Sequence, residues 1–370
     1  MQVLPNHKIR LIVLSLMFPY LLFVGLLLFF YYRKQSVLML FTMALFAVLR
    51  YDVGWDYMSY YSFSSDEGSL ALARERYSVV WEWLFTMAHS MKMPHLAIAI
   101  PSLITMGVVY QAVRMLCEKD KEQMSDALLV YSLWPFFYLG SFSTIRQSLA
   151  VALSLLVFAL LYKRKWLWAV VVFSFNFLVH PSSLLAICCL PFVLIQRRFS
   201  VWVALVVAGV AMWAISNWVD LVVMMDVEAF NEYVETYMDQ EDKWGRLLSW
   251  LLGLVALFLL TTSLLDKKQS LWQNKLSILV AIALSIDVYI YLSGMPSVIT
   301  RTTSYFSIFL MVVFYDALRR FPNPKLFRVL LTCALVMLFF IYLDRASRYE
   351  SNFEVTTSSG FVPYKTILTK

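Results

Sequence analysis

The stretch LIVLSLMFPYLLFVGLLLFFYY, residues 11–32, decides the fold class because it contains no charged residue. It is long enough for an α-helix to cross the hydrocarbon core of a bilayer, which needs roughly 20 apolar residues. The rest of the chain has the same character, since 61% of the 370 residues are hydrophobic and only 15% are charged. Soluble domains carry about 25% charged residues. The composition therefore predicts an integral membrane protein.

Apolar runs recur along the chain and predict an all-α, polytopic transmembrane bundle of about 11–12 spans, organised as one membrane domain over residues 1–370. A helix is favoured because it satisfies all its backbone hydrogen bonds within itself. Kinks or helix ends are expected at Pro135, Pro191 and Pro296. We expect spans at about 10–32, 36–49, 95–116, 126–142, 147–162, 166–179, 182–196, 200–219, 247–265, 275–292, 302–318 and 326–343.

The charge of the connecting loops alternates along the chain and predicts the orientation. Short basic loops stay in the cytoplasm. The short extracytoplasmic loops, at about 51–94 and 220–246, are then the acidic ones, and both termini, with a tail at about 344–370, face outward. Within the first outward loop, apolar residues from Val79 to Met87 recur at helical spacing and predict an interfacial helix. The basic loops contain Arg33–Lys34, Lys119 and Lys121, Lys163–Lys165, Arg197–Arg198, Lys267–Lys268 and Arg319–Arg320.

The first candidate site is the polar segment RYDVGWDYMSYYSF, residues 50–63, at a predicted membrane edge. Carboxylates among aromatic rings suit a sugar, because rings stack on the pyranose and a carboxylate accepts or removes hydroxyl protons. Gly54 permits a tight turn. The alternative is that these side chains only anchor the loop at the membrane surface. The candidate residues of this segment are Arg50, Asp52, Trp55, Asp56, Tyr57, Tyr60 and Tyr61.

Further candidates come from three later segments on the predicted outward side. Arg146, followed by Gln147, opens an apolar helix in SFSTIRQSLAVAL. A guanidinium can hold two phosphate oxygens, and a helix N-terminus adds backbone donors. A structural arginine bonded to loop carbonyls is the alternative. His180 in FNFLVHPSS ends one span, and Arg301 begins RTTSYF with Tyr305 one turn later. We expect these residues to converge.

Other function classes lack their usual residues in this sequence. It contains no GxxxxGK[ST], no glycine-rich dinucleotide loop and no HExxH, so nucleotide hydrolysis and zinc proteolysis are not indicated. No cofactor and no metal site are expected, although the carboxylates of Asp52 and Asp56 leave open the binding of a divalent ion. Nucleic acid is excluded as a partner because the net charge of +7 is scattered over short loops. Asp287, in mid-span, is expected to pair with another helix.

Taken together, these motifs resemble those of the EpsG family, a branch of the Wzy-like polysaccharide polymerases. Residues 50–63 resemble the family signature R-x-x-x-G-x-D-Y-x-x-Y. Trp55 stands where the family more often has a small or hydroxyl residue, and Pro181 follows His180. The remaining elements occur in the family's order: STIRQSLAVAL at 143–153, FLVHPSSL at 177–184, RTTSYF at 301–306 and PYK at 363–365.

The resemblance implies a GT-C-like glycosyltransferase of the bacterial cytoplasmic membrane, with its active site facing outward. It would polymerise oligosaccharide repeat units carried on undecaprenyl diphosphate into O-antigen, capsule or exopolysaccharide. The implied partners are this lipid-linked oligosaccharide, membrane lipids, a chain-length regulator and a flippase.

The residues and the resemblance together give a mechanistic hypothesis. Arg146 and Arg301 bind the diphosphate leaving group, and Asp56 or His180 deprotonates the acceptor hydroxyl, with Asp56 preferred. Arg50 orients Asp56 or holds a second diphosphate. The alternatives are a transporter or flippase of lipid-linked sugar, an O-antigen ligase and a membrane acetyltransferase. A transporter is less favoured because the polar residues gather on one side rather than along a path through the bilayer.

Overall fold

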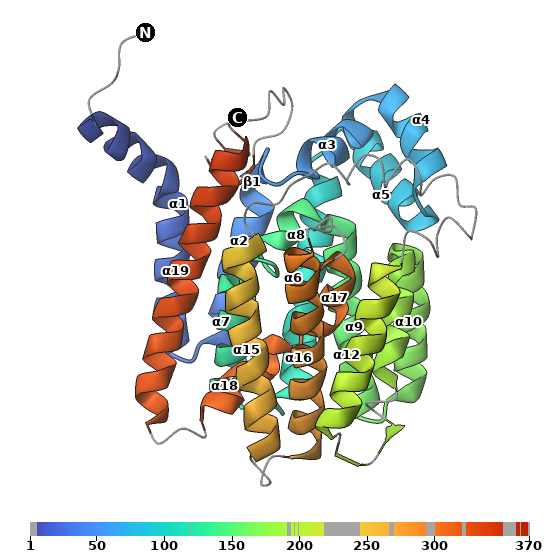
Figure 1. The fold of residues 1–370 in the computed structure, drawn as a ribbon. Coiled ribbons are helices and arrows are strands. Elements are labelled where there is room, and N and C mark those ends of the chain that lie inside the picture. The colour runs from blue at the N-terminus through green and yellow to red at the C-terminus, as the bar shows by residue number, and fades with distance from the viewer. Residues whose placement is uncertain are drawn as a thin grey trace. The chain divides into compact units, whose positions relative to one another are not determined.

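The computed structural model describes residues 6–118, 120–190, 194–195, 197–198, 200–217, 245–265, 270–293, 300–319, 323–350, 360–362 and 364–368. These residues are almost entirely helical, which confirms the predicted all-α class (Figure 1). The chain divides into two compact units, here called unit 1 and unit 2. Unit 1 contains Met1–Ser183 and Leu318–Lys370, and unit 2 contains Leu184–Ala317.

Several of the described helices have the length and apolarity of membrane spans, as the sequence predicts. Long apolar stretches lie in α6 (Leu96–Leu116), α9 (Ile145–Tyr162), α16 (Leu271–Leu292) and α19 (Pro324–Glu350). Shorter apolar stretches lie in α1 (Asn6–Tyr32), α2 (Ser36–Leu49), α10 (Trp166–Val179), α12 (Val201–Ser216) and α15 (Gly245–Leu265). Together they confirm a polytopic helical membrane protein.

The bundle of unit 1 is built around α9, which packs against α6 and α10. A buried amide fixes the second of these contacts. Asn176 on α10 donates through Nδ2 to the Ala150 carbonyl at 3.0 Å and to Ser154 Oγ at 2.8 Å on α9. An amide buried without such partners would cost free energy, so Asn176 sets the register of α10 on α9.

Three expected spans differ from the structure. The span at 126–142 is divided into α7 (Lys121–Leu133) and α8 (Gly140–Ser143), because Pro135 lacks the N–H that would continue α7. The span at 302–318 is likewise divided into α17 (Thr300–Ser307) and α18 (Leu310–Leu318). Within 182–196, Pro181–Cys189 forms the 3₁₀-helix η1 instead of an α-helix. Pro191 and Pro296 lie outside the described residues.

The loop between α2 and α6 folds into three short helices at one end of unit 1, namely α3 (Tyr57–Ser65), α4 (Glu67–Arg76) and α5 (Val79–Ser90) (Figure 1). The helix expected near residues 79–87 is thus confirmed as α5. Its buried face carries Trp81, Leu84, Phe85 and Ala88. The apolar residues expected on one face between Val79 and Met87 divide in the structure: Leu84 is buried, whereas Val79 and Trp83 are exposed, because the bundle packs against the other face of the helix.

At the opposite end of unit 1, an ion-pair network joins α1, α7 and α19. The buried Asp126 carboxylate accepts from Arg328 at 2.8 Å and from the Tyr31 hydroxyl at 3.0 Å. Arg328 also pairs with Glu122, which accepts from Lys34 at 3.0 Å. Basic loops that the sequence assigns to one side, such as those with Lys34 and Arg319, therefore share this end.

Unit 2 packs α16 against α15 and α12, with an apolar cluster between α12 and α16. Asp287 on α16 is buried and accepts a hydrogen bond from Thr303 Oγ1 on α17 at 2.5 Å. The expected pairing of Asp287 with another helix is therefore confirmed. The cluster between α12 and α16 consists of Ala204, Ile278, Ile282, Ile286 and Ile290.

Candidate functional site

The loop that begins at Arg50 lies directly on the junction between α8 and α9. Gly54 has a φ of +94°, and a Cβ there would stand 2.3 Å from the Phe142 carbonyl oxygen, so only glycine fits. The Trp55 N–H donates to Ser143 Oγ at 3.2 Å. Two motifs that are about 90 residues apart in sequence therefore meet in unit 1.

Asp56 makes the decisive contact of this interface. Its Oδ2 accepts a hydrogen bond from the backbone N–H of Ile145, the first residue of α9, at 3.0 Å. The first N–H groups of a helix have no partner inside the helix, and the partial positive charge there favours an anion. Asp56 thus caps α9 from a distant part of the chain, and Arg146 is the next residue of that helix.

Arg146 is held by an aromatic side chain, Tyr77, which lies between α4 and α5. Its guanidinium carbon lies 4.2 Å from the centre of the Tyr77 ring, a cation–π distance. Tyr60 is buried below, and its hydroxyl has no hydrogen bond of ordinary geometry. Burial raises the pKa of Tyr60, the Asp56 charge raises it further, and Arg146 acts in the opposite direction. The three side chains therefore form one electrostatic group.

Arg50 is a second cation, completely buried within unit 1. Its guanidinium carbon lies 4.1 Å from the centre of the Phe142 ring, and none of its three nitrogen atoms has a hydrogen-bond partner. Burial lowers the pKa of Arg50 to about 10. The surrounding tyrosines, of which Tyr138 has the largest effect, and Asp56 act in the opposite direction and raise it. Arg50 therefore remains charged at neutral pH, and it makes no hydrogen bond to Asp56.

The C-terminal segment covers this part of the site. We call residues 360–362 and 364–368 the C-terminal strap. The short strand β2 (Lys365–Thr366) pairs antiparallel with β1 (Arg50–Tyr51), with Tyr51 opposite Lys365. Lys365 Nζ donates to Asp52 Oδ2 at 2.7 Å. Asp52 itself has a φ of +53°, which is uncommon for a residue with a side chain.

Two further contacts fix the C-terminal strap. The Tyr364 ring stacks on Phe46 with centroids 3.9 Å apart, and its hydroxyl bonds to the Phe46 carbonyl. The Gly54 N–H donates to the Gly360 carbonyl at 3.1 Å. In the sequence, only the resemblance of PYK at 363–365 singled out this segment, and no spacing rule pairs it with Arg50.

The tyrosines of the first motif differ in exposure. Tyr57 and Tyr60 are buried, whereas Trp55 is 39% exposed and Tyr61 is partly exposed. The Tyr57 hydroxyl lies 2.9 Å from His95 Nδ1, and His95 Nε2 lies 2.5 Å from the Val48 carbonyl. Because a carbonyl only accepts, Nε2 carries the proton and Nδ1 accepts from Tyr57. The spacing of the motif alone does not reveal this role of His95.

His180 follows the last residue of α10, and α5 anchors this helix end. Trp81 Nε1 donates to the Val179 carbonyl at 2.9 Å, and the Trp81 ring packs edge-on against Tyr60 at 5.6 Å. His180 Nδ1 accepts from the Ser182 backbone N–H at 3.2 Å and lies 2.7 Å from Ser182 Oγ. His180 thus belongs to unit 1 together with Asp56 and Arg146, joined to them through Trp81 and Tyr60.

The remaining candidates lie in different places. Gln147 is partly buried beside Arg146. Arg301 is exposed and Tyr305 is buried on α17 in unit 2, so their convergence with the residues of unit 1 stays a prediction. Within the part of the chain that the structure describes, His, Cys, Asp and Glu form no group of three or more with metal-binding geometry.

A bundle of apolar helices with a charged and aromatic group at one end defines a polytopic membrane protein. The model of the EpsG family matches residues 33–366, nearly the whole chain, so the chain belongs to this family of membrane proteins of polysaccharide biosynthesis. Comparison with curated proteins and with solved structures gave no significant match.

Proposed function

We propose that this protein is a membrane glycosyltransferase that polymerises oligosaccharide repeat units at the outer face of the bacterial cytoplasmic membrane. Its donor and acceptor are sugars linked to undecaprenyl diphosphate. One observation carries the proposal: the Asp56 carboxylate is bonded to the N-terminus of α9, immediately before Arg146. A proton acceptor and an anion-binding cation thus lie together at one end of unit 1.

The cation acts on the leaving group. As the bond between the anomeric carbon and the phosphate oxygen breaks, negative charge develops on the diphosphate. A guanidinium fixed at that position stabilises the transition state more than the ground state. The Tyr77 ring contacts the Arg146 guanidinium and helps to hold it in place, and a planar guanidinium can give two parallel hydrogen bonds to phosphate oxygens. Arg301, on α17, is proposed as a second contact to the same group.

The carboxylate acts on the acceptor. Asp56 removes the proton from the acceptor hydroxyl, whose oxygen then attacks the anomeric carbon as the diphosphate leaves with the bonding electron pair. His180 is the alternative base, but its Nδ1 already accepts from the Ser182 N–H. A neutral His180 therefore carries its proton on Nε2 and can donate there but not accept. This tautomer favours Asp56 as the base and His180 as an orienting donor.

A transporter is less consistent with the described residues. From residue 17 onward, the helices α1, α2, α6, α9 and α10 carry two charged side chains, Arg114 and Arg146. Both lie near the end of a helix. The buried carboxylate Asp126 on α7 is paired with Arg328. The described parts of these helices thus offer no row of unpaired charges along their length, whereas a reaction at one end requires none.

The proposal is tested by deleting the gene in its native bacterium and separating the surface glycan by length. A polymerase mutant keeps single repeat units on the surface, and the ladder of longer products disappears. Loss of all surface glycan would instead indicate a flippase. Full-length glycan that stays on undecaprenyl diphosphate would indicate a ligase. Complementation by the parent gene restores the ladder, and complementation by Asp56→Asn at equal abundance does not.

A further inference from the structure

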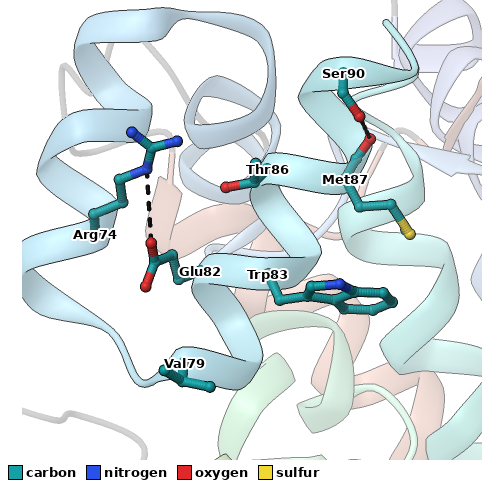
Figure 2. A pocket seen from close by; sticks show the side chains of 7 residues that line it. All are labelled: Arg74, Val79, Glu82, Trp83, Thr86, Met87 and Ser90. Atoms are coloured by element: carbon teal, nitrogen blue, oxygen red, sulfur yellow. Dashed lines mark hydrogen bonds and ion pairs between the residues drawn. The ribbon is translucent and has the colours of Figure 1, made fainter.

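A hollow on the outer side of α4 and α5 lies apart from the contacts of Asp56 and Arg146. Its volume is about 530 Å³, within the range of about 300–1,000 Å³ that is usual for ligand pockets. Figure 2 shows the side chains that line it. They are Arg74, Val79, Glu82, Trp83, Thr86, Met87 and Ser90.

The side chains of α5 in this hollow form two neighbouring rows. Val79, Trp83 and Met87 are spaced by four residues and give an apolar row, because residues four apart lie on the same side of a helix. Glu82, Thr86 and Ser90 give a polar row of the same spacing beside it. Val79 is 71% exposed and Trp83 is 64% exposed, so the apolar row is open to a ligand.

Arg74 reaches the polar row from α4. Its Nε lies 3.8 Å from Glu82 Oε1, and both side chains remain about half exposed (Figure 2). The Ser90 hydroxyl donates to the Met87 carbonyl at 2.8 Å and keeps acceptor capacity. The hollow thus offers a ring face, a carboxylate and hydroxyls on α5, and a guanidinium from α4.

This combination matches the chemistry of a carbohydrate. The C–H face of a pyranose is apolar and packs on an indole, while its hydroxyls need donors and acceptors at the edge of the ring. We propose that this hollow binds sugar residues of the growing glycan, at a subsite separate from the reacting atoms. The proposal rests on the proposed function for the identity of the glycan. A lipid surface fits less well, because Glu82 runs beside the exposed apolar row and pairs with Arg74, and lipid contact would take these charges out of water.

The place of α5 makes this subsite relevant to the reaction. Trp81, on its inner face, contacts both Tyr60 and the end of α10 that precedes His180. Sugars bound on the outer face would therefore lie on the same three-helix segment that supports Arg146 through Tyr77. Such a subsite would hold the polymer between additions and thereby lengthen the product.

The experiment uses the full-length protein in nanodiscs and short lipid-free oligomers of the repeat unit, prepared from the native polysaccharide. Trp83→Ala is expected to weaken binding of these oligomers roughly tenfold, equivalent to about 1.4 kcal/mol. Trp83→Phe, which keeps a ring, is expected to retain most of the affinity. The matched control is Trp166→Ala, because Trp166 is an exposed tryptophan at the start of α10. It should bind as the parent does.

The same variants are assayed with lipid-linked units. Trp83→Ala should make shorter products, while the first coupling of two units stays within about twofold of the parent. Equal oligomer affinity in the parent and Trp83→Ala would overturn the subsite. The fluorescence of Trp83 is the part of the parent's emission that Trp83→Phe lacks. If brominated phospholipid quenches this fluorescence and the oligomer does not change it, the apolar row faces lipid and the subsite is overturned. A parent that binds oligomers through Trp83 but couples no units would refute the proposed function and leave the subsite standing.

Discussion

The Asp56 carboxylate and the Ile145 backbone N–H are 3.0 Å apart and join the first motif of the chain to the N-terminus of α9. Because Ile145 directly precedes Arg146, this single bond determines where a carboxylate lies relative to an arginine. Asp56 therefore also has a structural role as the cap of α9. A loss of activity in an Asp56 variant can come from the loss of this cap or from the loss of the proposed base.

Asp56→Asn separates these causes. An asparagine oxygen can still accept from Ile145, and asparagine is as good a helix cap as aspartate, so folding should be preserved. As an amide it cannot take a proton, and we expect at least a hundredfold loss of polymerisation, the usual contribution of general base catalysis. Activity is measured as glycan chain length per molecule of protein in the membrane.

Asp56→Ala serves as the comparison, because it loses the cap as well and should lower stability by about 1 kcal/mol. Near-normal activity of Asp56→Asn at normal abundance would leave Asp56 with the capping role alone.

Arg146→Lys tests the planar contact. Lysine keeps the charge but loses the planar fork that binds two oxygens and changes the cation–π contact with Tyr77. We expect the coupling rate to fall at least tenfold with normal membrane insertion. Tyr77→Phe retains a ring and should be close to the parent, whereas Tyr77→Leu removes the support and should resemble Arg146→Lys. If lysine polymerises as the parent does, two-oxygen binding by this residue is wrong.

The C-terminal strap is expected to control access to Arg50. Tyr364→Ala removes the ring that stacks on Phe46, so the buried guanidinium of Arg50 should become reactive toward an arginine-specific dicarbonyl reagent. Labelling at Arg50 is read by mass spectrometry, with the exposed Arg164 as an internal standard. Lys365→Gln breaks only a partly exposed ion pair, typically worth less than about 1 kcal/mol, and should leave Arg50 protected. Equal protection in Tyr364→Ala would show that the strap does not cover Arg50.

The predicted orientation is tested with single cysteines. Ser65 and Arg164 are both exposed in unit 1, at the end of α3 and in the loop between α9 and α10. In a background without the native cysteines, Ser65→Cys should react with an impermeant thiol reagent in cells with a permeabilised outer membrane. Arg164→Cys should react only after the cytoplasmic membrane is broken. The reverse pattern would place Asp56 on the cytoplasmic side and contradict the proposed donor.

The network around Asp126 should make stability depend on pH. Hydrogen bonds from Arg328 and then Lys34 lower the pKa of Glu122 from 4.5 to about 2. A carboxyl group whose pKa is lowered by folding stabilises the protein above its unfolded pKa, and this stabilisation is lost as the pH falls from about 4.5 toward 2. Arg328→Gln should therefore lower the melting temperature at pH 7 and have a smaller effect at pH 3. Lys34→Gln, at a more exposed position, should change it less at both values.

Periodicity and composition predicted the helices that lipid surrounds, because a membrane span needs little more than length and apolarity. The ends of α2 and α10 were predicted to the residue for this reason. The division of a span, as at Pro135, was harder to predict. A proline indicates that the helix ends or bends, but it does not indicate the turn that follows.

The candidate site was predicted as a list of residues rather than as an arrangement. No sequence pattern indicated that Asp56 caps α9, because the bond joins residues 89 positions apart. The exposure of the tyrosines was also beyond reach. Tyr57 and Tyr60 lie in one short helix with Tyr61. Tyr60 is buried against Trp81 and Phe85 of α5, whereas Tyr57 contacts His95 just before α6, and neither contact can be read from the spacing of the motif.

The pairing of β1 with β2 also governs when the outer site can form during synthesis. Lys365 and its neighbours follow α19, so the ribosome makes them after every helix of the described bundle. Until they have been made, Arg50 lacks its cover and β1 lacks its partner strand. A chain released before residue 360 would therefore contain all the described helices and still leave β1 without its partner strand beside Arg50.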